Sequence, residues 1–296
     1  MILSTRINRR YFILRTGSAL AKLNVVIASV LFASCSSSQN QSTSTPTSQN
    51  VSASQQTNII KVGVWSVIAE DILKFIQKKL ASSQGLEIQT VKFGDWVQVN
   101  NALKSGEIDA NYFQHRLFME DSAKRLNLNL VMLNQTYLTP IGIYSKKIKS
   151  LSEIPNGATI AIQSDASNQD RTLKFLQSQK LIKLKDISGN LFSVKDMVEN
   201  SKNLQFKELE GPAIVRGLDD VVVGAFLGSL LIQAKQLDLR PIVQESTKDK
   251  RYALGLVTLQ GKENDPKIQK LNQLIIDPKV KDFIKNTYQD AVVPVF

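Results

Sequence analysis

Short β-branched runs alternate with amphipathic stretches from Ile59 to the end of the chain, and this alternation constrains the fold more than any other feature. Residues 59–64 predict a buried strand, and residues 68–80 place apolar side chains on one helical face. Gly85 ends that stretch, and residues 86–93 predict a second strand. Strands that alternate with helices indicate an α/β fold in which helices cover mostly parallel sheets.

The alternation falls into two sets separated by extended segments. The remaining strands are expected at 108–113, 158–162, 204–209 and 221–226, and the remaining helices at 96–104, 168–179, 214–218, 266–276 and 278–288. Extended stretches at 128–133, 140–144 and 252–259 link the sets. We therefore expect two lobes, residues 59–139 plus 252–296 and residues 140–251, with a cleft between them. Each lobe has a size that is usual for a domain. A single larger α/β domain is the alternative.

The first 34 residues are typical of a secretory signal peptide. Four arginines precede an apolar stretch at 23–32, which is about ten residues long and too short to span a bilayer as a helix. Small residues then lead to Cys35, the only cysteine of the chain. This arrangement resembles the lipobox of bacterial lipoproteins, which implies lipid attachment, palmitate included, at Cys35. An ordinary cleaved signal is the alternative, and residues 8–13 also resemble a twin-arginine signal.

A polar tether follows the cysteine. Residues 36–58 are almost wholly Ser, Thr, Gln and Asn, so they cannot bury enough apolar surface to fold. As a random coil, a tether over residues 35–58 reaches about 26 Å. The whole chain has a net charge of +11, and removal of residues 1–34 takes away five basic side chains and leaves +6. This moderately basic surface suits a position beside anionic lipid headgroups. No Lys/Arg run alternates with aromatic residues, so nucleic acid is not expected as a partner.

Several kinds of catalytic chemistry lack their residues in this sequence. His115 is the only histidine, and the lipid is expected to consume the only cysteine, which excludes Cys/His nucleophile pairs and multi-His or multi-Cys metal sites. No G-x-S-x-G, G-x-G-x-x-G or G-x-x-x-x-G-K-[ST] motif occurs. We expect no catalytic residue, no metal and no cofactor, and a binding protein rather than an enzyme. A hydrolase that uses a pair of the 26 acidic residues is the alternative, although no pair stands out.

The first candidate site lies at the carboxyl end of the strand predicted at 108–113. It groups two aromatic residues with the only imidazole, as Tyr112, Phe113 and His115. Ligands of open α/β sheets bind at that edge, so the rings are expected to wall a pocket and the imidazole to supply a polar contact. In the alternative interpretation, every second side chain of this strand points into the core of the lobe and serves packing alone. We expect one of the two aromatic rings to lie in the core in either case.

The second candidate site precedes a predicted helix. Ser167 and Asp170 are expected to cap the helix, and Asn168 and Arg171 are neighbours on its first turn. Backbone N–H groups, the helix dipole and a guanidinium that can hold both oxygens suit a carboxylate ligand. The alternative is an exposed cap in which Arg171 pairs with Asp165 or Asp170. A third and weaker signal is the extended crossing at 139–147, where Gly142 suggests that another backbone passes closely.

Together these stretches resemble the NlpA/MetQ family, the lipid-anchored substrate-binding proteins of methionine ABC importers. The likeness covers nearly all of residues 60–296 and is sharpest at 109–115, 140–147 and 168–171. It implies a two-lobed periplasmic-binding-protein fold (type II-like) that closes on one free amino acid. It also implies ABC permease and ATPase partners, a monomer, and a lipid-anchored location at the cell membrane facing the periplasm or outer surface. The ligand-binding set expected from it is Tyr112, Phe113, His115, Tyr137, Asn168, Arg171 and Ser229.

The sequence departs from the family pattern at three points. Leu227 stands where members usually carry an Asn that helps hold the amino acid. Residues 163–165 replace the usual Pro-Asn-Asp, and residues 65–67 lack the usual Gly/Pro-rich turn. Either Ser229 or another group compensates, or the ligand is another small carboxylate-bearing solute. A surface lipoprotein without transport activity, acting as an adhesin or signalling partner, is the competing functional class.

Overall fold

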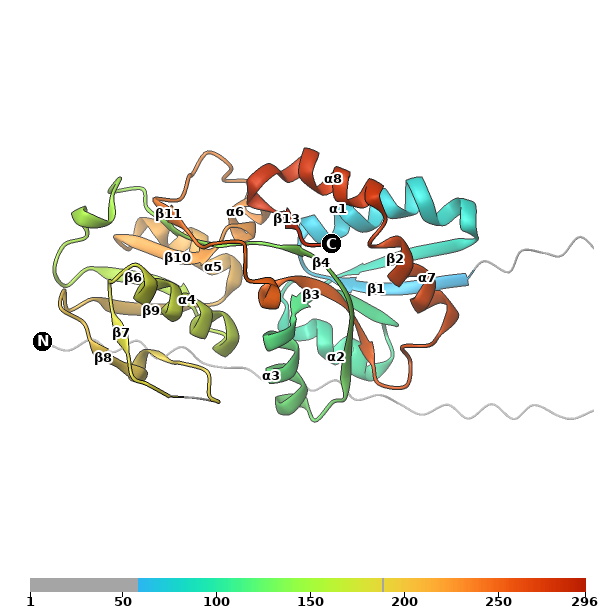
Figure 1. The fold of residues 1–296 in the computed structure, drawn as a ribbon, viewed down its shortest axis with the longest axis horizontal. Helices are drawn as coiled ribbons and strands as arrows, with labels where there is room; N and C mark the ends of the chain where they lie inside the picture. The colour runs from blue at the N-terminus through green and yellow to red at the C-terminus, as the bar shows by residue number, and fades with distance from the viewer. Residues whose placement is uncertain (1–57, 188) are drawn as a thin grey trace, which may run out of the picture. The chain divides into compact units, whose positions relative to one another are not determined.

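Two β-sheets organise the part of the chain that the computed structural model describes, residues 58–187 and 189–296 (Figure 1). We call them sheet A and sheet B. Cys35, the signal peptide and the tether before Asn58 lie outside the described residues. Sheet A has six strands in the order β13-β4-β12-β3-β1-β2, and sheet B has five in the order β11-β5-β10-β6-β9.

Sheet A combines a parallel half with an antiparallel half. Its parallel strands are β1 (Asn58–Val64), β2 (Leu86–Lys92) and β3 (Ala110–His115). The antiparallel half consists of β12 (Leu254–Leu259), β4 (Leu130–Leu138) and β13 (Val293–Pro294). Every residue of β3 is buried, as expected for a central strand whose two faces are both covered.

Sheet B repeats this division. Its parallel strands are β6 (Thr159–Gln163), β9 (Gln205–Leu209) and β10 (Val223–Leu227). The antiparallel strands are β5 (Ile141–Tyr144) and β11 (Val243–Gln244). A separate two-stranded sheet pairs β7 (Lys183–Leu184) with β8 (Met197–Glu199).

The α/β class is confirmed, but the expectation of mostly parallel sheets needs correction, because both sheets are mixed. The strands β1 and β2, which are joined through a helical stretch, pair in parallel, as the alternation predicts. The extended segments between the two sets are strands themselves, and they run back across each sheet in the antiparallel direction. The chain leaves sheet A after β4, enters sheet B at β5, and returns between β11 and β12.

Helices cover both sheets (Figure 1). Sheet A carries α1 (Val67–Ile76), α2 (Val97–Ser105), α3 (Arg116–Leu126), α7 (Pro266–Leu274) and α8 (Pro278–Tyr288). Sheet B carries α4 (Ala166–Ser178), α5 (Gly211–Arg216) and α6 (Ser229–Gln233). The helix expected at 68–80 is α1 followed by a π-helical turn, Gln77–Ala81. A Cβ atom added at Gly142 would lie 2.6 Å from the ring of Tyr144. This glycine therefore makes room for the Tyr144 ring, whereas the sequence suggested that it makes room for another segment of backbone.

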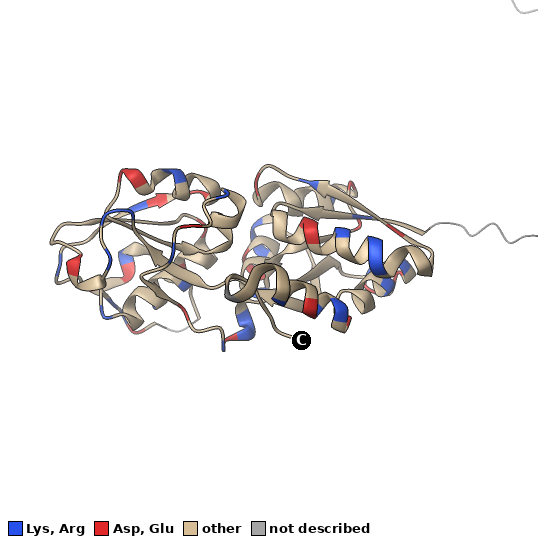
Figure 2. Cartoon of the chain, turned by 90° about the horizontal axis from the view of Figure 1, so that it is seen from above, with Lys and Arg blue, Asp and Glu red and all other residues tan. Residues whose placement is uncertain are grey.

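Charged side chains of both signs are interspersed over the helices and strands of the described residues (Figure 2). This mixture agrees with the absence of a basic stripe in the sequence. Within residues 58–187 and 189–296, no helix is both long enough and apolar enough to cross a membrane. Any attachment to a membrane through Cys35 therefore concerns a part of the chain that lies outside the described residues.

Candidate functional site: a pocket between the two sheets

A pocket forms where the carboxyl ends of the parallel strands of both sheets come together. Trp65 and Ser66 follow β1, and Trp96 follows β2. Leu227 ends β10, and Ser229 opens α6 directly after it. The first two turns of α4, which follows β6, contribute two more lining residues, Asn168 and Arg171. This is the edge at which open α/β sheets bind their ligands.

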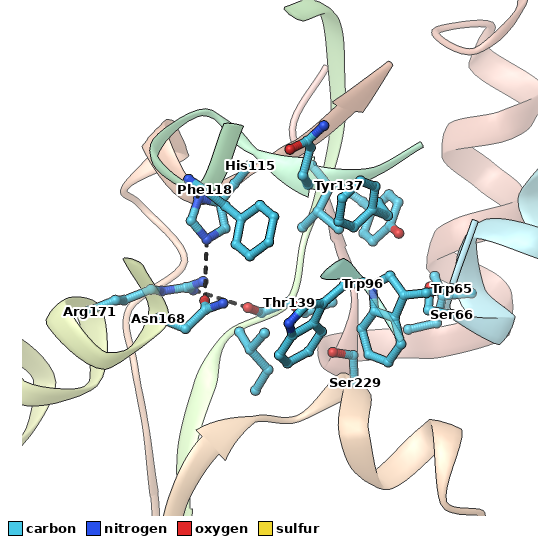
Figure 3. Close-up of a pocket in the computed structure, with 15 residues that line it drawn as sticks. Trp65, Ser66, Trp96, His115, Phe118, Tyr137, Thr139, Asn168, Arg171 and Ser229 are labelled. Atoms are coloured by element: carbon cyan, nitrogen blue, oxygen red, sulfur yellow. Dashed lines mark hydrogen bonds between the residues drawn. The ribbon is translucent and has the colours of Figure 1, made fainter. Parts of the chain in front are cut away.

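Aromatic rings form one wall of the pocket (Figure 3). The rings of Trp65 and Trp96 meet edge to face with their centroids 4.9 Å apart. Phe118 lies 6.5 Å from the Trp96 ring and 5.7 Å from the Phe113 ring, again in edge-to-face contacts. The cavity has a volume of only about 30 Å³, which leaves room for little more than water.

His115 is buried at the boundary between the two sheets, and both of its ring nitrogens are engaged. Nδ1 accepts the backbone N–H of Phe118 at 3.2 Å, so it caps α3 and must be unprotonated. The proton therefore sits on Nε2, which donates to Oδ1 of Asn168 at 3.2 Å (Figure 3). Burial, reinforced by the charge of Arg171, lowers the pKa of His115 to about 3. The ring is neutral at physiological pH and joins β3 to α4.

Asp165 caps α4, which corrects the expected cap of Ser167 and Asp170. Its carboxylate accepts the backbone N–H of Asn168 at 3.0 Å and also the side-chain amide of Asn168. The hydroxyl of Ser167 donates to the same carboxylate. The carboxylate of Asp170 is fully buried and accepts the backbone N–H of Phe192. Burial raises the pKa of Asp165, against the hydrogen bonds from Asn168.

Arg171 is 1 % exposed and pairs with Glu245, a residue that the sequence analysis did not name as a partner. Nη2 lies 2.6 Å from Oε2 of Glu245, and Nε donates to both oxygens of the same carboxylate. Nη2 also donates to the carbonyl of Thr139 at 3.0 Å (Figure 3). The guanidinium lies over the ring of Tyr252, 4.2 Å from its centroid. The alternative in which Arg171 pairs with Asp165 or Asp170 is therefore wrong.

The guanidinium is left with a single free nitrogen. Arg171 Nη1 is buried and has no hydrogen-bond partner within the described residues. Arg171 lines the pocket, so this nitrogen can serve a ligand there. The expectation that the guanidinium holds both oxygens of a carboxylate through two nitrogens does not match this geometry, because Glu245 already occupies that side of the fork.

Two further hydroxyls lie at the pocket (Figure 3). The hydroxyl of Tyr137 is buried and makes no hydrogen bond within the described residues. Burial raises the pKa of Tyr137, and nearby Ser66 lowers it in part, although the two hydroxyls do not reach hydrogen-bond geometry. Ser229 is also buried. Both can donate to or accept from a polar group of a ligand.

Six of the seven expected ligand residues line this pocket: Phe113, His115, Tyr137, Asn168, Arg171 and Ser229. Tyr112 does not, which corrects its expected place in the wall. Its ring is wholly buried against Tyr137, and its hydroxyl is hydrogen-bonded to Thr136 inside the core. Side chains of a strand alternate between its faces, so the neighbours Tyr112 and Phe113 point to opposite sides.

Leu227 lines the pocket with an apolar side chain, so the departure from the family pattern falls at the site itself. Its backbone N–H donates to Oε1 of Gln163 at 3.1 Å. Gln163 belongs to the second altered segment, and its Nε2 is buried without a partner within the described residues. Leu227 and Gln163, which belong to two of the three segments that depart from the family pattern, therefore contact each other next to the pocket.

The sequence also contained signals for residues that we did not predict. Trp65 and Trp96 are the only two tryptophans, and each follows a predicted parallel strand, the position at which ligands gather. Glu245 gave no such signal, because it lies 74 residues from Arg171 in a segment without a regular pattern. Within residues 58–187 and 189–296, no group of His, Cys, Asp and Glu is arranged to hold a metal ion.

Known proteins are similar to this chain in sequence and in fold. The D-methionine-binding lipoprotein MetQ of Escherichia coli O157:H7 is 36% identical over 239 residues, which cover 80% of this chain and 88% of MetQ. Lipoprotein 28 of E. coli K12 is 33% identical over 285 residues, covering 95% and 97% of the two chains.

Solved structures and a family profile indicate the same family as these relatives. A nutrient-binding protein from Burkholderia cenocepacia bound to methionine superposes with a TM-score of 0.76 at 35% identity, covering 80% of this chain and 100% of that one. The crystal structure of the methionine-binding protein MetQ matches with a TM-score of 0.75 at 34% identity, covering 81% and 99%. The sequence profile of the NlpA lipoproteins matches residues 60–296. The chain belongs to the NlpA lipoprotein family.

Proposed function

We propose that this protein is the lipid-anchored substrate-binding component of an ABC importer. It binds a free amino acid, with methionine as the first candidate, in the pocket between the two sheets and delivers it to the permease and ATPase subunits. The observation that carries the proposal is the pocket itself, which is lined both by Arg171, whose Nη1 has no partner within the described residues, and by several aromatic rings. The guanidinium suits a carboxylate, and the wall suits an apolar side chain.

Methionine is favoured by chemistry and by the relatives. A flexible thioether packs well against aromatic rings, and Trp65, Trp96 and Phe118 supply such a surface. The E. coli relative is named for D-methionine, and the B. cenocepacia structure holds methionine. Both are about one-third identical to this chain, so they support the ligand class for the proposal.

Binding requires a conformational change. A cavity of about 30 Å³ is too small for any amino acid, so the two sheets must separate to admit one and close again around it. We propose that the moving bodies are residues 59–139 plus 252–296 and residues 140–251, in a monomer. The crossings between β4 and β5 and between β11 and β12 would carry the hinge.

Calorimetric titration of ligand-stripped protein against the twenty amino acids tests the proposal. We expect methionine to give saturable heat, and Arg171→Ala to weaken binding at least tenfold because the carboxylate loses its charged donor. Arg216→Ala, which removes an exposed arginine at the end of α5, is the matched control and should bind as the wild type does. Full-strength binding by Arg171→Ala would refute the role of the guanidinium.

Leu227 supports an alternative within the same class, a different small carboxylate-bearing solute. The apolar side chain offers no hydrogen bond where the family usually has an amide. Heat with another solute of the panel, and none with methionine, would favour this alternative. Heat with methionine alone would reject it and assign the compensating contact to another group, with Ser229 as the first candidate.

A further inference from the structure

Each positively charged side chain near the free nitrogen of Arg171 forms an ion pair with one carboxylate. Each nearby cation lies within 2.8 Å of a carboxylate oxygen, in the pairs Arg171–Glu245, Lys174–Asp170 and Arg251–Asp249. Asp165 adds a further carboxyl group that is held only by neutral donors. Among the described residues that line the pocket, Arg171 is the only charged one, because His115 is neutral. Its surroundings therefore carry no excess of positive charge.

Glu245 produces this balance without lining the pocket. Its carboxylate takes Nε and Nη2 of Arg171 and also accepts the backbone N–H of Ile141 at 3.2 Å, which fixes it beside the start of β5. The Arg171 side chain is 1 % exposed and that of Glu245 is 17 % exposed. The pair is thus largely removed from water, and Arg171 meets a ligand with its charge already compensated.

A compensated guanidinium distinguishes ligands by their net charge. A monoanion bound to Nη1 would bring an unbalanced negative charge into a closed, desolvated site, which is costly. A zwitterion carries its own ammonium beside the carboxylate, so its entry leaves the net charge unchanged. Neutral oxygens at the pocket, such as the hydroxyls of Ser229 and Tyr137, can accept from that ammonium.

We propose that Glu245 is a positioning residue that sets the charge class of the ligand. By neutralising Arg171 it makes the pocket select zwitterionic solutes over monoanions of the same shape. The proposal rests on the proposed function, since it concerns a carboxylate-bearing ligand in this pocket. It adds a role for Glu245, which does not line the pocket, and it states which ligands the pocket rejects, namely monoanions.

The test measures the affinities for two matched probes, methionine and its 2-oxo acid, 4-(methylthio)-2-oxobutanoate. The probes share the side chain and the carboxylate and differ in net charge. We expect the wild type to prefer methionine at least tenfold. In Glu245→Gln the amide oxygen can still accept from Arg171 and Ile141, but the site gains a positive charge, so the preference should move at least tenfold toward the 2-oxo acid.

Two further variants separate charge from structure. Glu245→Asp keeps the charge on a shorter side chain and should retain the preference for methionine even where both affinities fall. Glu199→Gln makes the same charge change in an exposed pair with Lys183 and should leave the preference unchanged. The same preference in the wild type and Glu245→Gln would overturn the role of Glu245 alone. Binding of neither probe by the wild type would overturn the proposed function, and the role of Glu245 would fall with it.

Discussion

At the scale of single residues, Leu227 determines how closely this site follows its family. Replacing Leu227 by Asn restores an amide of similar size at the wall of the pocket. We expect methionine to bind about 10- to 150-fold more tightly, because a hydrogen bond to a charged group contributes about 1.5–3 kcal/mol. Calorimetry with Leu227→Ile as the apolar control measures this. Equal methionine affinity in the two variants would mean that position 227 does not contact the polar groups of the ligand.

His115 couples stability to pH. An unfolded histidine titrates near pH 6.5, whereas burial and Arg171 hold the pKa of His115 at about 3. Between these values the unfolded chain binds a proton that the folded protein does not. Stability therefore falls as the pH drops from about 6.5 toward 3, by up to about 4 kcal/mol from this group.

The variant His115→Asn isolates this contribution. Asparagine can still cap α3 by accepting the N–H of Phe118, but it does not titrate. Urea unfolding at pH 7 and pH 4 should show a smaller loss of stability in the variant than in the wild type. An equal loss in both proteins would show that other groups account for the acid sensitivity.

Glu245 shows what residue-level reasoning could not reach. The local pattern around Arg171 predicted a helix there, but it named Ser167 and Asp170 as the cap instead of Asp165. The partner of the guanidinium is encoded by the return of the chain through sheet B, which brings Glu245 beside Ile141. Such pairings depend on tertiary structure and leave no short-range signal.

At the scale of elements, the cap of α4 links stability to the site. Asp165→Ala removes the acceptor for the backbone and side-chain N–H groups of Asn168 and should cost about 1–2 kcal/mol of unfolding free energy. It should also weaken ligand binding, because Asn168 loses the contact that orients it toward His115.

Asp265→Ala provides the matched control for this cap. Asp265 caps α7 by accepting the N–H of Lys267, and it does not line the pocket. Its replacement should lower stability by a similar amount and leave ligand affinity unchanged. Thermal unfolding together with calorimetry measures both properties. Unchanged affinity in Asp165→Ala would show that the cap supports only the helix.

Elements with a strong hydrophobic period were predictable, and elements without one were not. The strands β1 and β6 are rich in β-branched residues and mostly buried, so the sequence predicted them. By contrast, α3 was not predicted, because only Phe118, Met119 and Ser122 of its residues are buried and its apolar stripe is narrow. Its start depends on the His115 side chain, which a sequence pattern does not reveal.

At the scale of the whole molecule, we expect the pocket to be held near a membrane by the lipid on Cys35. In Cys35→Ser the thiol that would carry the acyl chains is lost, so the protein should no longer take up labelled palmitate and should appear in the soluble fraction after cell breakage. Radiolabelled palmitate incorporation and fractionation measure this, with Ser37→Ala as the control in the adjoining tether. Membrane retention of an unlabelled Cys35→Ser protein would refute the lipid anchor.

The most direct test of the account uses the two tryptophans of the chain, both of which line the pocket. Every tryptophan signal of this protein therefore reports on the proposed site. Titration of methionine into ligand-stripped protein should change the tryptophan emission with saturation in the wild type, and the change should require a much higher concentration in Arg171→Ala. Saturable binding by calorimetry with no change in tryptophan emission, or the same titration curve in both proteins, would contradict the assignment of the ligand to this pocket.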